Sequence, residues 1–270
     1  MNKVVLITGA SAGIGKATAI YLAQNGYMVY GAARRVEKME ELKTFGIRPI
    51  RLDVTKEESI VACISQIFTE AGSIDILVNN AGFGSYGAIE DVSMEDARYQ
   101  LEVNVFGAMR LTQLVLPKMR ENKYGKIVNV SSVGGKTAFP LGGWYHASKF
   151  ALEALSDSLR NEVRQFGIDV IVIEPGATQS EWGGIAFDSL LKVSGNTAYS
   201  DLTAKTHKAF TKLSGNIPQP IVIAKLIREG IEAKNPKTRY SGGQMASTVL
   251  LLAKILPDKI MDKVMMSQLK

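Results

Sequence analysis

Residues 3–15 read KVVLITGASAGIG, an apolar run that leads directly into a glycine-rich turn. The run has the length of a buried β-strand, and apolar residues at helical spacing follow the turn. A strand, a glycine turn and a helix in this order are typical of a site that cradles the phosphates of a dinucleotide. Gly9 would allow the tight turn, Gly13 would let the backbone approach a pyrophosphate, and Gly15 would let helix and strand pack closely. The free N–H groups and positive dipole end of the helix favour phosphate binding.

Apolar runs of strand length alternate with helical segments along the rest of the chain. We expect strands at 3–8, 28–32, 48–52, 76–79, 126–130, 169–173 and 239–241, and helices at 13–25, 36–45, 56–71, 94–122, 145–166 and 221–233. This alternation predicts an α/β fold, a Rossmann-type doubly wound parallel sheet of about seven strands with helices on both faces. A chain of 270 residues with 46% apolar composition fits one domain over residues 1–270.

Tyr145 and Lys149 are the strongest candidates for chemistry. They lie four residues apart in a helical segment, so they share one face of the helix. A phenol titrates near pH ~10, and a nearby ammonium would lower that pKa toward a value useful for proton transfer. Ser132 precedes the tyrosine by thirteen residues. A tyrosine–lysine pair alone is common on amphipathic helices, but here it accompanies the glycine turn.

Further motifs follow in order along the chain. NNAG occupies residues 79–82 after an apolar strand, Asn104 lies in the triplet VNV, and PGAT occupies 175–178 after another apolar strand. With these motifs the chain resembles the short-chain dehydrogenase/reductase family over most of residues 3–245. The resemblance implies an enzyme that transfers a hydride between a nicotinamide cofactor and a carbonyl or alcohol carbon.

The resemblance also implies a role for each catalytic candidate. Tyr145 would be the acid–base group, and Lys149 would lower its pKa and bind the nicotinamide ribose. Ser132 would donate a hydrogen bond to the substrate oxygen, and Asn104 would hold a water that relays protons from Lys149. Ser131 is the competing serine, but the spacing of thirteen residues favours Ser132.

Two other interpretations of these residues are weaker. His146 follows Tyr145 directly and so points to a different face of the helix, which indicates a structural role. Ser132 and Lys149 could form a serine–lysine hydrolase pair, but that hypothesis explains neither the glycine turn nor Tyr145.

The cofactor contacts implied by the resemblance come from several separate segments of the chain. Asp53 and the turn at 79–82 resemble the adenine-side and ribose-side contacts, and Thr178 would hold the carboxamide. The expected cofactor-binding residues are Gly9, Ser11, Gly13, Ile14, Gly15, Arg34, Arg35, Asp53, Val54, Asn80, Ala81, Gly82, Tyr145, Lys149, Pro175, Gly176 and Thr178.

The end of the second strand indicates which nicotinamide cofactor is bound. An acidic residue there binds the ribose of NAD, and an arginine accommodates the extra phosphate of NADP. Ala33 stands at the expected place of the acid, and Arg34 and Arg35 follow. We therefore expect NADP(H), with Arg34 as the main contact and Arg35 in support. The alternative is that both arginines only begin a solvated helix. The function would then be that of an NAD(H)-dependent alcohol dehydrogenase of the same family.

NADP(H) preference favours reduction of a ketone or aldehyde, although the same residues can work in both directions. A non-catalytic NADP(H)-binding regulator is the rival from another class, and the presence of Tyr145 and Lys149 argues against it. The segment 179–220 corresponds to a substrate lid, and its Ile185, Phe187 and Leu190 suggest a steroid-, retinoid- or acyl-like substrate. The same side chains could instead pack within the lid or at an oligomer contact.

Positive charge is concentrated toward the C-terminus. The net charge is +6, and residues 192–270 hold 13 Lys/Arg against 5 Asp/Glu. The tail at 245–270 is predicted to be an amphipathic helical segment. It is either a solvated basic surface with a packed inner face, or a weak contact for a membrane surface or an anionic substrate group.

Composition excludes several other classes. We expect no metal site, because the chain has one cysteine and two histidines, and no disulfide. No nucleic-acid-binding pattern occurs, and no apolar run reaches the ~20 residues that cross a bilayer. Because the first strand begins at residue 3, we expect no signal peptide and a cytoplasmic location. A homodimer or homotetramer is also expected.

Overall fold

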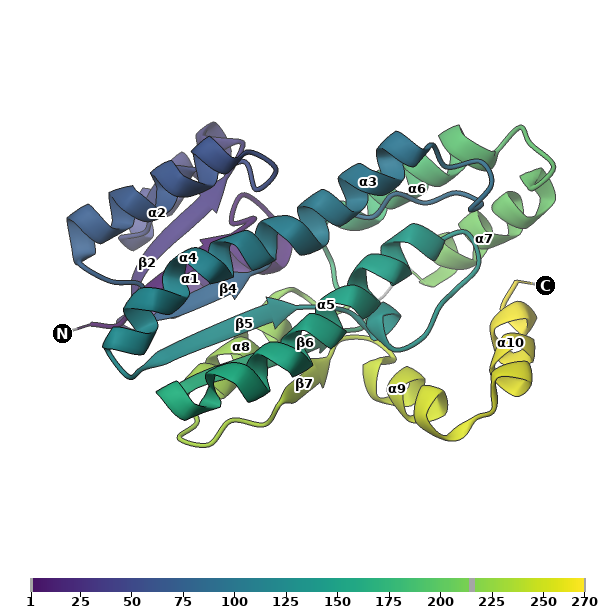
Figure 1. The fold of residues 1–270 in the computed structure, drawn as a ribbon. Coiled ribbons are helices and arrows are strands. Elements are labelled where there is room, and N and C mark those ends of the chain that lie inside the picture. Colours follow the sequence, from purple (N-terminus) through teal and green to yellow (C-terminus); the bar gives the residue numbers. More distant parts are fainter. Residues whose placement is uncertain (1, 214–216, 270) are drawn as a thin grey trace.

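The structure is a computed structural model that describes residues 2–213 and 217–269. Its seven-stranded sheet is parallel throughout, in the order β3-β2-β1-β4-β5-β6-β7 (Figure 1). The strands are β1 (Val4–Thr8), β2 (Met28–Ala33), β3 (Arg48–Arg51), β4 (Ile76–Asn79), β5 (Gly125–Val130), β6 (Ile168–Pro175) and β7 (Arg239–Gly242). The predicted doubly wound sheet is therefore confirmed.

Helices cover both faces of the sheet because its strands are apolar on both sides. In β1, Val4 and Leu6 pack toward α2 and α4, whereas Val5 and Ile7 pack toward α1 and α8. The α-helices are α1 (Gly13–Gln24), α2 (Glu57–Ala71), α3 (Met94–Leu101), α4 (Gly107–Glu121), α5 (Gly143–Val163), α6 (Glu181–Ser194), α7 (Ser200–Leu213), α8 (Ile221–Glu232), α9 (Ala246–Ile255) and α10 (Asp258–Ser267). Figure 1 shows that α5 lies along the sheet at β5 and β6.

Two predicted helices differ in detail from the expectation. The segment Val36–Phe45 forms 3₁₀ turns, in which the buried Met39 and Leu42 lie three residues apart and so share one face. The helix expected at 94–122 is divided into α3 and α4 by a π-helical turn at Glu102–Phe106. A π turn widens the helix locally and often marks a functional position.

The strand order reverses between β1 and β4, which are neighbours in the sheet although two strands, β2 and β3, lie between them along the chain. In open α/β sheets, ligands bind beyond the carboxyl ends of the strands at such a switch point. The glycine turn follows β1 at this edge, and the NNAG turn follows β4. The fold thus brings the expected cofactor segments to one edge of the sheet.

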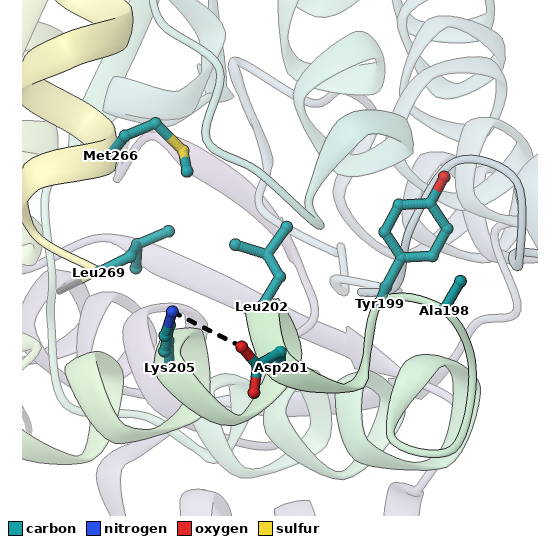
Figure 2. Close-up of a pocket in the computed structure, with 7 residues that line it drawn as sticks. All are labelled: Ala198, Tyr199, Asp201, Leu202, Lys205, Met266 and Leu269. Carbon is teal, nitrogen blue, oxygen red and sulfur yellow. Dashed lines mark ion pairs between the residues drawn. The ribbon is translucent and has the colours of Figure 1, made fainter.

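Additional helices occupy the predicted lid and tail. The lid segment contains α6 and α7, with 214–216 outside the described residues, and the tail contains α9 and α10, with residue 270 outside. A cavity of about 380 Å³ lies between α7 and the end of α10, and Figure 2 shows the side chains that line it. The residues that line it are Ala198, Tyr199, Asp201, Leu202, Lys205, Met266 and Leu269. Among the described helices, none is long and apolar enough to cross a membrane.

Candidate active site

The junction of β1 and β4 is held by a side chain that the sequence interpretation did not single out. The hydroxyl oxygen of Thr8 accepts hydrogen bonds from the backbone N–H groups of Asn80 (3.0 Å) and Ala81 (2.9 Å). In return, the Asn80 amide donates to the carbonyl of Thr8 at 2.8 Å. A threonine that ends a buried apolar strand is the sequence signal that could have identified it, because a buried hydroxyl needs partners.

The glycine turn fits a ligand whose phosphates approach the backbone. Gly9 has a φ of +68°, a conformation that favours glycine, and a Cβ there would lie 2.9 Å from the Cα of Ala81. A Cβ at Gly15 would overlap the carbonyl oxygen of Gly9 and the Asn80 amide. Gly15 therefore lets the first turn of α1 lie directly against the residues that follow β1 and β4. No side chain caps the first N–H groups of α1.

Other cofactor candidates reach the same edge from β6. Pro175 ends β6, and the hydroxyl of Thr178 donates to the carbonyl of Gly176 at 3.1 Å. A Cβ at Gly13 would lie 3.0 Å from the Cβ of Ser180, so the segment after Thr178 lies over the glycine turn. Ile14, in the first turn of α1, accepts a hydrogen bond at its carbonyl from within that helix.

The two arginines after β2 point in different directions. Ala33 is buried at the end of the strand, and both Arg34 and Arg35 are exposed. The Arg35 guanidinium donates to the hydroxyl of Ser11 in the glycine turn at 3.4 Å, whereas Arg34 donates to the hydroxyl of Tyr99 in α3 at 2.8 Å. Arg35 is therefore the arginine that lies beside the turn, while Arg34 spans toward α3.

Asp53 and Val54 follow β3 at the neighbouring position along this edge. The Asp53 carboxylate accepts hydrogen bonds from the backbone N–H and the hydroxyl of Thr55, at 3.0 and 2.8 Å. Val54 is buried, and a Cβ at Gly107 would overlap its carbonyl oxygen. The two residues thus fix the loop against the start of α4.

Tyr145, Ser132 and Lys149 come together at the carboxyl ends of β5 and β6. The phenol of Tyr145 forms a hydrogen bond with the hydroxyl of Ser132, whose oxygen also accepts from the N–H of Gly134 at 3.0 Å. The ammonium of Lys149 donates to the carbonyl of Val130 at 2.9 Å and lies 6.0 Å from the centre of the tyrosine ring. All three catalytic candidates are therefore placed around one point.

Burial shifts the pKa values of both members of this pair. It raises the pKa of Tyr145 to about 12, and the hydrogen bond from Ser132 acts in the opposite direction. It lowers the pKa of Lys149 to about 8, against the attraction of the Glu153 carboxylate. The lowering of the tyrosine pKa by Lys149 stays a prediction.

Asn104 lies in the π turn, where its side chain joins three parts of the site. Its amide donates to the carbonyl of Phe83 and the hydroxyl of Ser148, both at 3.0 Å, and its oxygen accepts from the Phe83 N–H at 3.1 Å. A Cβ at Gly82 would lie 3.1 Å from the Asn104 oxygen and 3.7 Å from the Lys149 ammonium. Gly82 therefore lets the NNAG turn approach both side chains closely.

The competing residues occupy structural positions. His146 is buried, and its Nδ1 forms a 3.0 Å hydrogen bond with the carbonyl of Gly134. Burial lowers the pKa of His146, so the ring is neutral at pH 7. The hydroxyl of Ser131 is buried beneath Gly135 and faces away from the Ser132–Tyr145 contact.

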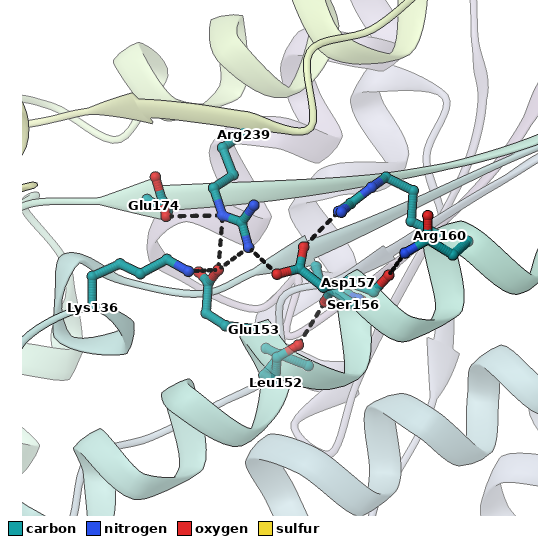
Figure 3. A network of polar contacts seen from close by, with 10 residues as sticks. Lys136, Leu152, Glu153, Ser156, Asp157, Arg160, Glu174 and Arg239 are labelled. Atoms are coloured by element: carbon teal, nitrogen blue, oxygen red, sulfur yellow. Dashed lines mark hydrogen bonds and ion pairs between the residues drawn. The ribbon is translucent and has the colours of Figure 1, made fainter. Parts of the chain in front are cut away.

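A partly buried charge network, with Glu153 and Glu174 as its buried members, joins the segments that build the site (Figure 3). Arg239, at the start of β7, donates to Glu153 at 2.9 and 3.0 Å and to Asp157 at 2.8 Å, and it lies 3.4 Å from Glu174. Lys136 forms a 2.9 Å ion pair with the same Glu153 oxygen. The network thus connects α5, the segment after Ser132 and the end of β6.

Sequence interpretation missed this network, although one signal was available. Glu174 is a charged residue near the end of an otherwise apolar strand, and Glu153 lies one helical turn beyond Lys149. Buried carboxylates require partners, but no sequence pattern indicates that Arg239 supplies one.

Comparison with known proteins establishes the family. The family model of short chain dehydrogenase matches residues 3–187. The chain is 35% identical over 262 residues to a 3-ketodihydrosphingosine reductase of Bacteroides thetaiotaomicron, covering 96% of this chain and 95% of that protein. It is 33% identical over 279 residues to an NADPH-dependent 3-dehydrocapnine reductase of Ornithobacterium rhinotracheale, covering 98% and 96%. A solved short-chain dehydrogenase from Streptomyces avermitilis matches with a TM-score of 0.83 at 33% identity, covering 98% and 95%.

The chain therefore belongs to the short-chain dehydrogenase/reductase family. It is an oxidoreductase that acts on CH–OH and C=O groups.

The charge network predicts a specific pH dependence of stability. Burial and the neighbouring Glu153 carboxylate raise the pKa of Glu174 from 4.5 to about 7, while Arg239 and Lys136 act in the opposite direction. A carboxyl group with a raised pKa in the folded state costs stability as pH rises from about 4.5 to 7. Glu174→Gln removes this titration and keeps an oxygen facing Arg239. The melting temperature of the variant, relative to wild type, should therefore be higher at pH 8 than at pH 5, by about 2–4 °C for a difference of roughly 1 kcal/mol.

Thermal melts of both proteins at the two pH values measure this difference. The conservative variant Glu121→Gln, at an exposed ion pair with Lys118, is the control for simple charge removal. An equal offset between Glu174→Gln and wild type at both pH values would contradict the assignment of a raised pKa to Glu174.

Proposed function

We propose that this chain is an NADP(H)-dependent reductase of ketones or aldehydes in which Tyr145 is the proton donor. One observation carries the proposal: the Tyr145 phenol is hydrogen-bonded to the Ser132 hydroxyl, and the Lys149 ammonium lies 6.0 Å from the centre of its ring. Burial raises the pKa of Tyr145, so the phenol is protonated at neutral pH and can give its proton to a developing alkoxide.

The neighbouring side chains supply orientation and charge. Ser132 accepts from the Gly134 N–H, which fixes its oxygen. Its hydroxyl, which is hydrogen-bonded to Tyr145 in this structure, would donate to the carbonyl of a bound substrate. Lys149 is a cation below about pH 8 and lies on the side of Gly82, where it can donate to hydroxyl groups of a ligand. Asn104 fixes the Phe83 backbone and Ser148 beside them.

The residues fit a dinucleotide. Gly9 and Gly15 leave room that a Cβ would fill, and the first N–H groups of α1 are free for phosphate oxygens. When bound, the reduced nicotinamide supplies a hydride to the carbonyl carbon. Asp53, the turn at 79–82 and Thr178 would contact the remainder of the cofactor.

Preference for NADP(H) is supported by the charge at the end of β2. Ala33 offers no carboxylate that would repel a ribose phosphate, and Arg34 and Arg35 place two guanidinium groups at this edge. One relative is named as NADPH-dependent. An NAD(H)-dependent alcohol dehydrogenase of the same family is the alternative, and the arginine variants below discriminate between them.

A hydrophobic substrate is supported by the surroundings of Tyr145. Tyr86, Leu141 and Leu190 form a buried apolar cluster with it. Two relatives are named as reductases of 3-ketodihydrosphingosine and 3-dehydrocapnine. The homo-oligomeric state, the cytoplasmic location and the lid role of 179–220 stay predictions.

The first experiment tests the proton donor. Tyr145→Phe keeps the ring in the buried cluster but removes the transferable proton, so NADPH oxidation with a ketone should fall by about 10²–10⁴-fold. The wild-type activity is measured over a panel of ketones and aldehydes graded by size, and NADPH binding to the variant is followed by fluorescence. Near wild-type turnover in Tyr145→Phe would exclude Tyr145 as the donor.

The second experiment tests cofactor choice. Arg34→Ala and Arg35→Ala should each weaken NADPH more than NADH, by about 10–100-fold for a charge-assisted contact of roughly 1.5–3 kcal/mol. Because Arg35 lies beside Ser11 and Arg34 contacts Tyr99, we expect the larger loss at Arg35. Dissociation constants for both cofactors give the answer, and equal losses for NADPH and NADH would remove both arginines from the phosphate site.

A further inference from the structure

We infer that His146 is a positioning residue that holds the Ser132 hydroxyl in place through Gly134. The inference rests on the proposed function, in which Ser132 donates to the substrate oxygen, and it adds the side chain that orients this donor. Three features of the described residues support it: the hydrogen bonds on both sides of Gly134, the burial of the His146 ring, and the close packing of Gly134 against α5.

Gly134 links the two side chains through its own backbone. It lies in the short turn Val133–Gly135, which Ser132 immediately precedes. The N–H of Gly134 donates to the Ser132 hydroxyl oxygen at 3.0 Å, and its carbonyl forms a 3.0 Å hydrogen bond with Nδ1 of His146. One side of Gly134 thus orients the serine oxygen, while the other is anchored to α5.

The surroundings of His146 fix which ring nitrogen carries the proton. A carbonyl oxygen only accepts hydrogen bonds, so Nδ1 donates to Gly134. Nε2 is buried and has no hydrogen-bond partner among the described residues. The imidazole is enclosed by other rings, with distances of 6.5, 5.4 and 5.5 Å between its centre and those of Tyr86, Phe139 and Tyr145. Because His146 is only 2% exposed, water has little access to the bond with Gly134.

Gly134 lies directly against two side chains of α5. A Cβ at this position would lie 2.7 Å from Nδ1 of His146 and 3.3 Å from Cε1 of Tyr145. Because glycine has no side chain, its backbone can approach both rings at once. The position of the His146 ring is therefore transmitted to the turn, and from the turn to the Ser132 oxygen.

This arrangement matters most when negative charge develops on the substrate oxygen. A donor that is already oriented stabilises that charge without a cost of reorganisation. Loss of the His146 contact frees the turn and lets the Ser132 hydroxyl move. The effect should therefore fall on kcat, whereas the affinity for NADPH should change little.

The test begins with His146→Leu, which keeps an apolar side chain of similar size in the buried cluster but removes the donor. With saturating NADPH and the best substrate of the ketone and aldehyde panel, kcat should fall by about 10–100-fold, the cost of a displaced or lost oxyanion donor. His146→Asn places an amide N–H close to the position of Nδ1 and should restore kcat to within about threefold of wild type. Equal losses in the two variants would overturn the inference.

A double-mutant cycle with Ser132→Ala separates positioning from general packing. If His146 acts through Ser132, adding His146→Leu to Ser132→Ala should change kcat by less than about twofold. Phe139→Leu is the matched control, because Phe139 packs on the same imidazole and its effect should multiply with that of Ser132→Ala. Multiplying losses for His146→Leu as well would overturn the inference.

A measurement without substrate separates failure of this inference from failure of the proposed function. If no ketone or aldehyde is reduced, the proposed function fails, but ¹⁵N–¹H correlation spectra of the imidazoles at pH 7 still decide whether His146 holds the turn. The chain has two histidines, and His146→Asn removes the signal to be assigned. A proton on Nδ1 supports the inference. A proton on Nε2 overturns it, because the Gly134 carbonyl would then have no donor in this ring.

Discussion

Lys149 carries an ammonium group into the interior beside the phenol of Tyr145, and an uncompensated buried charge is costly. Burial lowers its pKa to about 8, while the Glu153 carboxylate, one turn further along α5, favours the charged form. The carbonyl of Val130 accepts its hydrogen bond at 2.9 Å. The cation at the site thus depends on the end of β5 and on a buried acid in its own helix.

Glu153 is itself part of a larger network of charged side chains. Glu153 is paired with Arg239 and Lys136, and Arg239 also faces Glu174. Because these partners come from β7, from the segment after Ser132 and from β6, the network that compensates buried charge also aligns the segments that carry the site. A buried ion network is weak evidence for a gain in stability. Its main consequence here is that it fixes the relative positions of the segments that carry the site. Tyr145 itself belongs to a buried apolar cluster with Tyr86, Leu141 and Leu190.

Local patterns were enough to predict the parallel sheet and the glycine turn, because the strands, the helices and the turn each depend on residues close in sequence. Features that depend on packing were not predictable. The π turn at 102–106 leaves helical periodicity almost unchanged, and the contact of Arg239 with Glu153 joins residues 86 positions apart. The raised pKa of Tyr145 follows from burial in the folded chain.

The pH dependence of NADPH binding tests the role of the buried cation most directly. Dissociation constants are measured by fluorescence from pH 7 to pH 10 for wild type and for Lys149→Met, with circular dichroism confirming that both remain folded. If Lys149 binds the cofactor as a cation, the wild-type constant is level up to about pH 8 and then rises, approaching that of the variant, which shows no such rise. The same pH dependence in both proteins would contradict the placement of this charge at the centre of the site.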